Sequence, residues 1–392
     1  MEVTAASVCI RGTYDEEVVR DVAARLRQEL AVPATCAFVF ASVDYADHLE
    51  DFIETLRLYG HIPEVFGCTG RGVIGSEIEH EEGPGFSVLL LSLPDTRLHV
   101  RTFGREEVKN FNEANDWKSW AGVEVDKVNS WLAFVNPLVI NIEGWLSFWN
   151  KAYPGVPCLG GLASSSLRTE GISVFHNEDV VEGGLLVGLS GATICEPLVS
   201  QGCRPIGEPF TITQVDRNVV YQLGGKSAFE VLNTVISEMT DEERARAKGN
   251  VFAGLATSEY LDDYKQGDFL VRNILGADPE SGGVVIGSLP RLGQTLQYQM
   301  RDCSSAMKEM EHLLVERKGK PRPMASLVFS CIGRGASFFG QENYDPGMLA
   351  KYLGRHPSAG FFCNGEVGPV AGQNFIHGYT MTAGLFRMAD NL

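Results

Sequence analysis

The sequence predicts a mixed α/β fold (α+β class), with two pseudo-symmetric halves in which mixed sheets are layered against helices. Three observations predict it. Short apolar runs rich in Val, Ile and Phe recur along the chain, glycine-rich turns connect them, and amphipathic helical patterns lie between them. The 392 residues include 43 glycines, an excess that favours tight turns and close backbone approaches over long helices.

Four stretches of the chain share one layout, in which an apolar run, a glycine-rich turn and another apolar run follow one another. The first stretch begins with CAFVFASV and continues through IPEVFGCTGRGVIG. Continuous apolarity bounded by Gly, Pro, Asn or Asp is typical of strands that are buried on both faces. We therefore predict four equivalent buried strands, at residues 36–43, 131–138, 251–256 and 326–331.

Three segments between these runs have helical periodicity. In 16–30 the apolar residues Val19, Val22 and Leu26 recur at the spacing of one helix face. The segments 226–239 and 303–320 follow the same pattern, and the second of them ends in basic residues before a glycine and a proline. We expect these helices to lie outside the sheets.

The similarity of the two halves predicts two domains, the first over residues 1–200 and the second over residues 201–392. The connection between them falls within 192–210, a stretch that contains three prolines. A loop at 318–324 lies inside the second domain.

The charge balance argues against two classes of partner. Fifty acidic and 33 basic residues give a net charge of −17, and this field repels nucleic-acid phosphates and anionic lipid. The apolar stretches are too short to span a membrane, and the first residues have no basic and apolar leader pattern. Nine cysteines without a C-x-x-C pair indicate reduced thiols, so we expect a cytoplasmic protein.

The sharpest local motif is FSCIGRG at 329–335. Here a buried strand ends in Cys331, and the next glycine turn projects Arg334, whose guanidinium suits bidentate capture of a carboxylate or phosphate. The same sequence is also compatible with a purely structural turn that has a surface arginine and a core cysteine.

Further polar residues follow or lie in nearby apparent strands of the same half. Asn364 and Glu366 occupy a glycine-bracketed turn after an apolar strand, His377 is in the next strand, and Arg301 and Asp302 follow another. We predict that at least three of six residues, these five together with Arg334, line one cavity at glycine-rich strand ends.

The N-terminal half repeats part of this chemistry. FGCTGRG contains Cys68 and Arg71 in the same Cys-x-Gly-Arg-Gly pattern, and GGLASSS offers Ser164, Ser165 and Ser166 as a small anion-binding nest. The phosphate-loop, G-x-S-x-G and H-E-x-x-H motifs are absent from the sequence. The eight histidines are dispersed, so we predict no metal site.

These motifs together resemble the FIST family. GCTGRGVIGSEIEHEEGPGFSVLLLSLP and GGLASSS are similar to the FIST-N domain. VSQGCRPIGEPFTIT, GDFLVRNILGAD, FSCIGRG and GFFCNGEVGPVAGQNFIHGYT are similar to FIST-C, and the resemblance covers residues 35–386. It implies an intracellular sensory module for signal transduction that binds a small ligand, with amino acids among the candidates. The sequence departs from the family at Ile332 and at Tyr344, where relatives have a polar residue and a histidine.

The resemblance and the motifs leave three function classes open. The first is a sensor for a small, anionic or amino-acid-like ligand, which passes its signal to a separate protein partner. The second is an enzyme, such as a hydrolase that uses Cys331, Glu366 and His377. The third is a haem-based nitric-oxide sensor, since one branch of the family is reported to bind haem. Four histidines of the N-terminal half do not lie at the centre of an apolar strand, so we expect no cofactor; they are His48, His61, His80 and His99.

Overall fold

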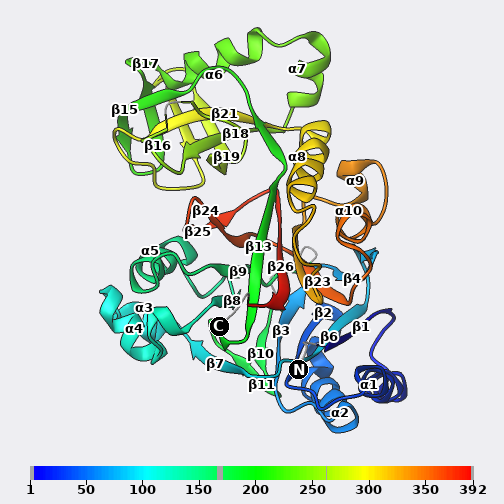
Figure 1. Ribbon diagram of the computed structural model, residues 1–392. Helices are drawn as coiled ribbons and strands as arrows, with labels where there is room; N and C mark the ends of the chain where they lie inside the picture. The colour runs from blue at the N-terminus through cyan, green and yellow to red at the C-terminus, as the bar shows by residue number, and fades with distance from the viewer. Residues whose placement is uncertain (1–3, 166–170, 262, 390–392) are drawn as a thin grey trace. The chain divides into compact units, whose positions relative to one another are not determined.

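The computed structural model describes residues 4–165, 171–261 and 263–389. Its backbone divides into two compact units. The first contains the chain up to Val199, Glu311–Ile376 and the chain from Thr380 onward, and the second contains Ser200–Met310 and His377–Tyr379. Mixed sheets and helices alternate along the chain, which confirms the predicted mixed α+β class (Figure 1). The predicted division at residues 200 and 201 stays a prediction.

The first unit contains three six-stranded sheets built on one plan. At the centre of each is a parallel pair of strands joined by a helical crossover. The pairs are β2 (Cys36–Ser42) with β3 (Val65–Gly70), β8 (Ser130–Val135) with β9 (Cys158–Leu162), and β22 (Ala325–Cys331) with β23 (Ser358–Cys363). The crossovers contain α2 (Leu49–Gly60), α5 (Ile142–Ala152), and α9 (Ala336–Phe339) with α10 (Tyr344–Leu353).

Antiparallel strands extend each sheet on the side of the first strand of the pair. The inner ones are β6 (Gly85–Ser92), β12 (Gly184–Gly191) and β26 (Thr380–Met388), and the outer ones are β1 (Thr4–Arg11), β7 (Thr96–Phe103) and β13 (Thr193–Gln201).

We call each parallel pair, with its crossover and the hairpin that follows it, a repeat. A hairpin completes each sheet on the other side, and this hairpin belongs to a different repeat from the parallel pair of the sheet. The hairpin after β3, β4 (Val73–Gly75) with β5 (Ile78–His80), pairs with β23. The hairpin after β23, β24 (Glu366–Val370) with β25 (Gln373–His377), pairs with β9. The hairpin after β9, β10 (Val174–His176) with β11 (Asp179–Val181), pairs with β3. The three repeats therefore exchange hairpins in a cycle.

One glycine in each repeat permits the close approach of the paired parallel strands. A Cβ atom added at Gly67, Gly160 or Gly360 would lie 1.8 Å from a carbonyl oxygen of the neighbouring strand. That distance is far inside van der Waals contact, so only glycine fits. Because the three glycines occupy equivalent positions, they also define which residues of the three repeats correspond to one another.

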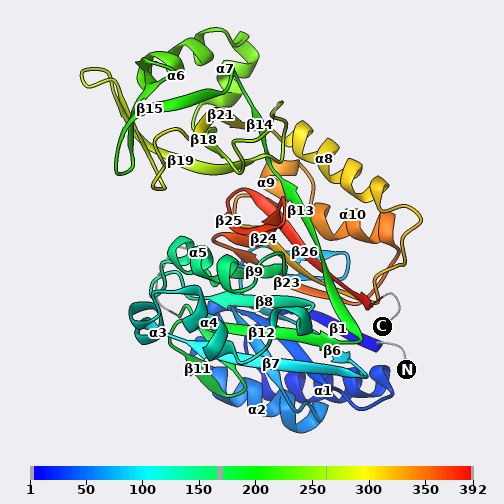
Figure 2. The ribbon, with the colours of Figure 1, turned by 60° about the vertical axis from the view of Figure 1, so that its left-hand side comes forward.

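The inner faces of the three sheets share one apolar core. It contains phenylalanines from all three, and the rings of Phe40 and Phe361 stack with their centroids 4.9 Å apart. Outside the first sheet lie α2 and α1 (Glu16–Leu30), whose N-cap Asp15 accepts hydrogen bonds from two backbone amides (Figure 2). The prediction of a helix over 16–30 is confirmed.

The second unit is built on antiparallel pairing. Its sheet runs β14 (Cys203–Pro205), β21 (Thr295–Arg301), β15 (Phe210–Asp216), β16 (Val219–Leu223), β20 (Gly283–Ile286), β19 (Phe269–Asp278) and β18 (Val251–Ala256), with β17 (Lys226–Ser227) beside β16. Because β21 pairs with β18 as well as with β15, the path closes into a barrel. Helix α6 (Ala228–Ser237) packs on its core, and α7 (Asp241–Ala247) follows.

Three of the four strands predicted as equivalent are β2, β8 and β22, the first strands of the parallel pairs. The fourth, Val251–Ala256, is a buried strand, but the prediction of equivalence is wrong for it, because both of its neighbours run antiparallel to it. The predicted helices 226–239 and 303–320 correspond to α6 and to α8 (Cys303–Glu316). Among the described residues, none of the helices combines the length and the apolarity needed to cross a membrane.

Candidate functional site

Three strand ends of the first unit meet at a junction made of equivalent positions. In the alignment set by the three glycines, Arg71, Ser164 and Asn364 occupy the same place in their repeats. The Ser164 amide donates to the Thr69 carbonyl at 3.1 Å, and the Asn364 amide donates to the Leu162 carbonyl at 3.3 Å. All three are predicted site residues, and the structure brings their backbones together.

The Ser164 hydroxyl closes this junction. It accepts a hydrogen bond from the Arg71 amide at 2.9 Å and donates one to the Phe362 carbonyl at 2.5 Å. The hydroxyl is buried, so it serves to join strands from three repeats and is not presented to solvent as an anion nest. Ser165 is half-buried beside it, and Ser166 lies outside the described residues.

The other predicted residues of this region differ in exposure. Asn364 is exposed, and the Arg71 guanidinium forms an ion pair with the Glu82 carboxylate near the surface. Cys68 lies in the apolar core, where burial holds the pKa of its thiol well above the usual range.

Arg334 is buried in a bidentate ion pair. Its Nε and Nη2 atoms donate to the two carboxylate oxygens of Asp345 at 2.9 and 2.7 Å, and both side chains are at most 1% exposed. Ser330 donates a further hydrogen bond to Asp345 at 2.8 Å. The guanidinium carbon lies 4.9 Å from the centre of the Phe339 ring, and this ring also stacks against Tyr344 with centroids 4.0 Å apart.

The local sequence explains this placement. The Arg334 amide donates to the Cys331 carbonyl in a tight turn, and Gly335 continues with φ of 100°, a left-handed value that favours glycine. A Cβ atom at Gly335 would also lie 2.5 Å from a carboxylate oxygen of Glu81. Helix α10 then presents Asp345 to the guanidinium.

The charge of Arg334 lowers the pKa of two further buried carboxyl groups, but burial has the larger, opposite effect on both. Burial raises the pKa of Glu366 to about 8, against the opposing effects of Cys363, the Thr380 amide and Arg334. The pKa of Glu79 is also raised to about 8, first by burial and then by the charges of Asp345 and Glu81. Both groups are therefore largely protonated at neutral pH. We call Arg334, Asp345, Glu79 and Glu366 the arginine–carboxyl cluster.

Glu79 and Glu366 differ in their hydrogen bonding. The Thr380 amide donates to Glu366 Oε2 at 3.2 Å, and the Cys363 thiol lies 3.3 Å from Glu366 Oε1. Both carboxyl oxygens of Glu79 are buried and have no hydrogen-bond partner among the described residues. The Glu79 backbone amide, by contrast, donates to the side-chain oxygen of Asn343 at 2.7 Å.

The Cys363 thiol beside the cluster is not activated. Burial and the neighbouring Glu366 raise the pKa of Cys363 well above its usual range, so the thiol stays protonated. Cys331 is also buried, and the Gly333 amide donates toward its sulfur at 3.5 Å.

The remaining predicted site residues belong to the second unit. The Arg301 guanidinium lies 5.6 Å from the centre of the Tyr379 ring, and His377 is buried. Asp302 accepts a hydrogen bond from the Ser305 amide at the start of α8 and lies within 3.9 Å of two arginine side chains. Asp302 thus has a capping role in the structure.

Sequence reasoning missed three members of the first-unit site. Asp345, Cys363 and Glu79 were not among the predicted site residues. The sequence offered one indication, the short separation between Arg334 and Asp345 along the chain. Glu79 and Glu366 reach Arg334 through the exchanged hairpins β4–β5 and β24–β25, which no local pattern reveals.

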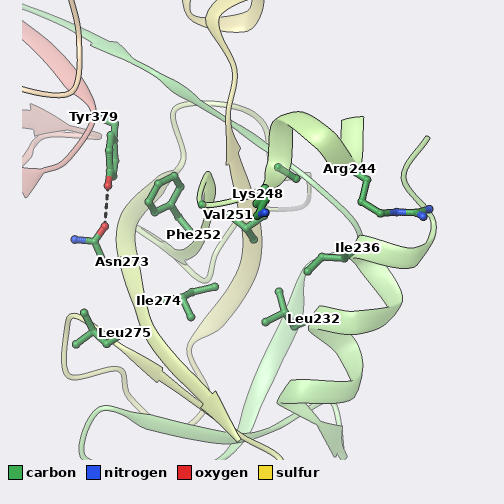
Figure 3. A pocket seen from close by; sticks show the side chains of 12 residues that line it. Leu232, Ile236, Arg244, Lys248, Val251, Phe252, Asn273, Ile274, Leu275 and Tyr379 are labelled. Atoms are coloured by element: carbon green, nitrogen blue, oxygen red, sulfur yellow. Dashed lines mark hydrogen bonds between the residues drawn. The ribbon is translucent and has the colours of Figure 1, made fainter. Parts of the chain in front are cut away.

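The second unit contains an open groove of about 810 Å³ that sequence reasoning also missed. Apolar side chains from α6, β18 and β19 surround it, and polar residues stand at its edges (Figure 3). The apolar lining comprises Leu232, Ile236, Val251, Phe252, Ile274 and Leu275.

The polar edge of the groove contains one hydrogen-bonded pair of side chains and two basic residues. The Tyr379 hydroxyl donates to the Asn273 side-chain oxygen at 2.9 Å, and the Tyr379 ring lies against Phe252. Lys248 lines the groove, whereas the Arg244 guanidinium is directed outward (Figure 3) and donates to the Met239 carbonyl at 2.9 Å. Among the described residues that line the groove there is no aspartate or glutamate.

Two solved structures that align with this chain are distant likenesses. A cyanuric acid hydrolase aligns with a TM-score of 0.33 and 10% identity, over 99% of this chain and 100% of that chain. A second cyanuric acid hydrolase, from A. caulinodans, aligns with a TM-score of 0.32 at the same identity and coverage. Likenesses this distant support no inference about activity.

Comparison with known sequences is decisive about family. The uncharacterized protein Rv0628c of Mycobacterium tuberculosis is 33% identical over 374 residues, which cover 93% of this chain and 95% of the relative. The uncharacterized protein Mb0898c of Mycobacterium bovis is 31% identical over 376 residues, which cover 93% and 94%. Residues 35–226 match the FIST N domain and residues 228–369 match the FIST C domain. The chain therefore belongs to the FIST family.

Proposed function

We propose that this protein is a sensory module that binds a small molecule in the groove of its second unit. FIST domains are recognised as small-ligand sensory domains, which supports the general function. The observation that carries the location is the groove itself. Its volume of about 810 Å³ falls in the range of roughly 300–1,000 Å³ that is typical of sites for small molecules.

The lining of the groove supports an anionic ligand with an apolar body. Aliphatic and aromatic side chains would desolvate the body, and Lys248 would face a carboxylate at the edge. The Tyr379–Asn273 pair offers hydrogen-bonding groups to an amino or hydroxyl substituent. An aliphatic or aromatic carboxylate, amino acids included, has these properties. A role in ligand binding for the predicted residues of the first unit stays a prediction.

Thermal unfolding with a defined panel tests this function. Leucine, phenylalanine, phenylacetate and hexanoate would be compared with their amides, which lack the carboxylate charge. Because a ligand that binds only the native state raises its stability, a carboxylate at 100 times its Kd should add about 2.7 kcal/mol, whereas its amide should add much less. Failure of every carboxylate in the panel to stabilise the protein would contradict the proposal.

A matched pair of variants tests the location. Lys248→Gln should weaken carboxylate binding, because it removes the cation beside the groove. Lys265→Gln removes the same charge from an exposed position of the second unit and should leave binding unchanged. If Phe252→Ala and Lys248→Gln both bind as tightly as wild type, the ligand site lies elsewhere.

A further inference from the structure

A smaller groove, of about 660 Å³, also lies along helix α6 in the second unit. Leu232 and Ile236 of this helix line the larger groove of about 810 Å³, whereas Val231 and Val235 line the smaller one. The other walls of the smaller groove are the turn at 207–208, the start of β15 and strand β17. The two grooves share no lining residue among those that the structure describes. The volume of the smaller groove is also within the range of roughly 300–1,000 Å³ that is typical of small-molecule sites.

Two glycines bring the walls of the smaller groove together. Gly207 has φ of 64°, and a Cβ atom added there would lie 2.5 Å from the Val235 side chain, so the turn packs directly on α6. Gly224 has φ of 58°, and a Cβ atom added there would lie 3.2 Å from the Phe210 ring. Both φ values lie in the left-handed region that favours glycine. The backbone therefore holds the turn before β15 against the helix.

Part of the lining of the smaller groove is apolar. Val231 and Val235 belong to the apolar core of the barrel, and Phe210 packs against that core. Phe229 also lines the groove and is half-buried, but it is not one of the described side chains of that core. The groove therefore offers two phenylalanine rings and two aliphatic side chains to the apolar body of a ligand.

The polar part of the lining is mainly acidic. Glu208, Glu230 and Glu238 line the groove, and all three are exposed. Lys226 is the one basic residue among the described lining residues, so the carboxylates outnumber the cations by three to one. Within the described part of the chain, none of these three carboxylates forms an ion pair. We call this site the acidic groove.

From these observations we propose that the acidic groove binds a small organic cation, an ammonium or guanidinium group attached to an apolar body. The glutamates would pair with the cationic group, while Phe210 and Phe229 would cover the body and attract the cation through their ring faces. The larger groove has basic residues and no acidic residue among its described lining, so the two sites select ligands of opposite charge. The acidic groove does not depend on the function proposed for the larger one.

Calorimetric titration of the full chain with phenethylamine tests the proposed ligand class. 2-Phenylethanol has the same apolar body without the charge, and methylammonium has the charge without the body. Phenethylamine should bind saturably, and both controls should bind at least about tenfold more weakly. Added sodium chloride should weaken phenethylamine binding, because the glutamates are exposed and their charges are screened. Equal affinity for phenethylamine and 2-phenylethanol would overturn the proposal.

Variants test the location of the site. The double change Glu230→Gln and Glu238→Gln should weaken phenethylamine binding by about five- to tenfold, the scale of two exposed ion pairs. Phe229→Ala should weaken it as well. Glu242→Gln, an exposed change on α7, and Lys248→Gln in the larger groove should have no such effect. Melting temperatures without ligand check that each variant is folded. Wild-type affinity in the double variant would contradict the proposal.

Two measurements distinguish a small molecule from a protein occupant. A blocked glycyl-lysyl-glycine peptide has one ammonium group on a peptide backbone and should bind more weakly than phenethylamine. Tighter binding of the peptide would make the groove a docking site for a basic protein segment and overturn the assignment. Sedimentation velocity tests a second copy of this chain as the occupant, and a dimer that dissociates in the double variant would also overturn it.

Discussion

Two turns of the first unit share the pattern Cys-x-Gly-Arg-Gly and have opposite environments. In the turn at 68–72 the Arg71 side chain is 32% exposed and pairs with Glu82, itself 72% exposed. In the turn at 331–335 the Arg334 side chain is 1% exposed and pairs with Asp345, which is 0% exposed. The same five-residue pattern therefore places one guanidinium at the surface and one in the interior.

The difference comes from the strand that precedes each turn. Cys68 lies in β3, the second strand of its parallel pair, and a hairpin leads the chain away from it to another sheet. Cys331 ends β22, the first strand of its pair, and the crossover with α9 and α10 covers the turn. A short motif determines the turn, whereas the position in the repeat determines burial.

The largest effect that tests this comparison is the loss of Asp345. Asp345→Asn leaves the Arg334 charge buried without its carboxylate, so the free energy of unfolding should fall by about 3–5 kcal/mol. Glu82→Gln removes the corresponding partner of Arg71 and should cost less than about 1 kcal/mol, because that pair is exposed. Urea denaturation at pH 7 measures both. Equal losses would show that the two turns do not differ energetically.

A pH series sharpens the description of the buried turn. Because the pKa values of Glu79 and Glu366 are raised to about 8, the native protein keeps protons that the unfolded chain releases between about pH 4.5 and 8. Over this window each group should lower the free energy of unfolding by up to about 1.4 kcal/mol per pH unit, with no further loss well above pH 8.

Glutamine variants isolate this pH dependence. Glu366→Gln cannot ionise, so its stability should decline less between pH 5.5 and 8 than that of wild type, and the variant should be relatively more stable at pH 8.5. Glu82→Gln is the control, since its carboxylate lies at the exposed turn. Parallel stability curves for wild type and Glu366→Gln would show that Glu366 is ionised in the native protein.

The smallest effect concerns the exposed turn, which Ser164 fixes. Ser164→Ala leaves the Arg71 amide without its acceptor and the Phe362 carbonyl without its donor, at a cost of roughly 1–3 kcal/mol. Ser165→Ala changes a half-buried neighbour and should stay within about 0.5 kcal/mol. Melting temperatures of the two variants distinguish them, and equal values would mean that the hydroxyl contributes nothing to the junction.

Much of the fold could be predicted, because its elements follow local rules. The helix over 16–30 has its apolar face and its Asp15 cap in one continuous segment. The buried strands are continuous apolar runs, and both arginine turns are bounded by glycines. The run 251–256 shows the limit of such rules. A buried strand has the same apolar sequence pattern in a parallel pair and in an antiparallel barrel, so the pattern does not predict the direction of its neighbours.

The site was less predictable, because its contacts join distant parts of the sequence. Arg334 and Glu366 were named for their place in glycine turns, and the structure puts both in the arginine–carboxyl cluster. Their grouping with Glu79 requires the exchanged hairpin β4–β5, whose destination is not encoded in residues 73–80 alone. The groove was missed because its lining residues are ordinary apolar side chains, separated along the chain.

The cyclic exchange of hairpins has a consequence for biosynthesis. As the chain leaves the ribosome, Val73–His80 emerges early, but its partner strand Ser358–Cys363 is translated near the end. Until then the first sheet can form its parallel pair, while the hairpin carries unpaired backbone groups that invite association with other chains. The newly made protein therefore passes through a long vulnerable interval, and chaperones that shield exposed strand edges should engage it before translation is complete.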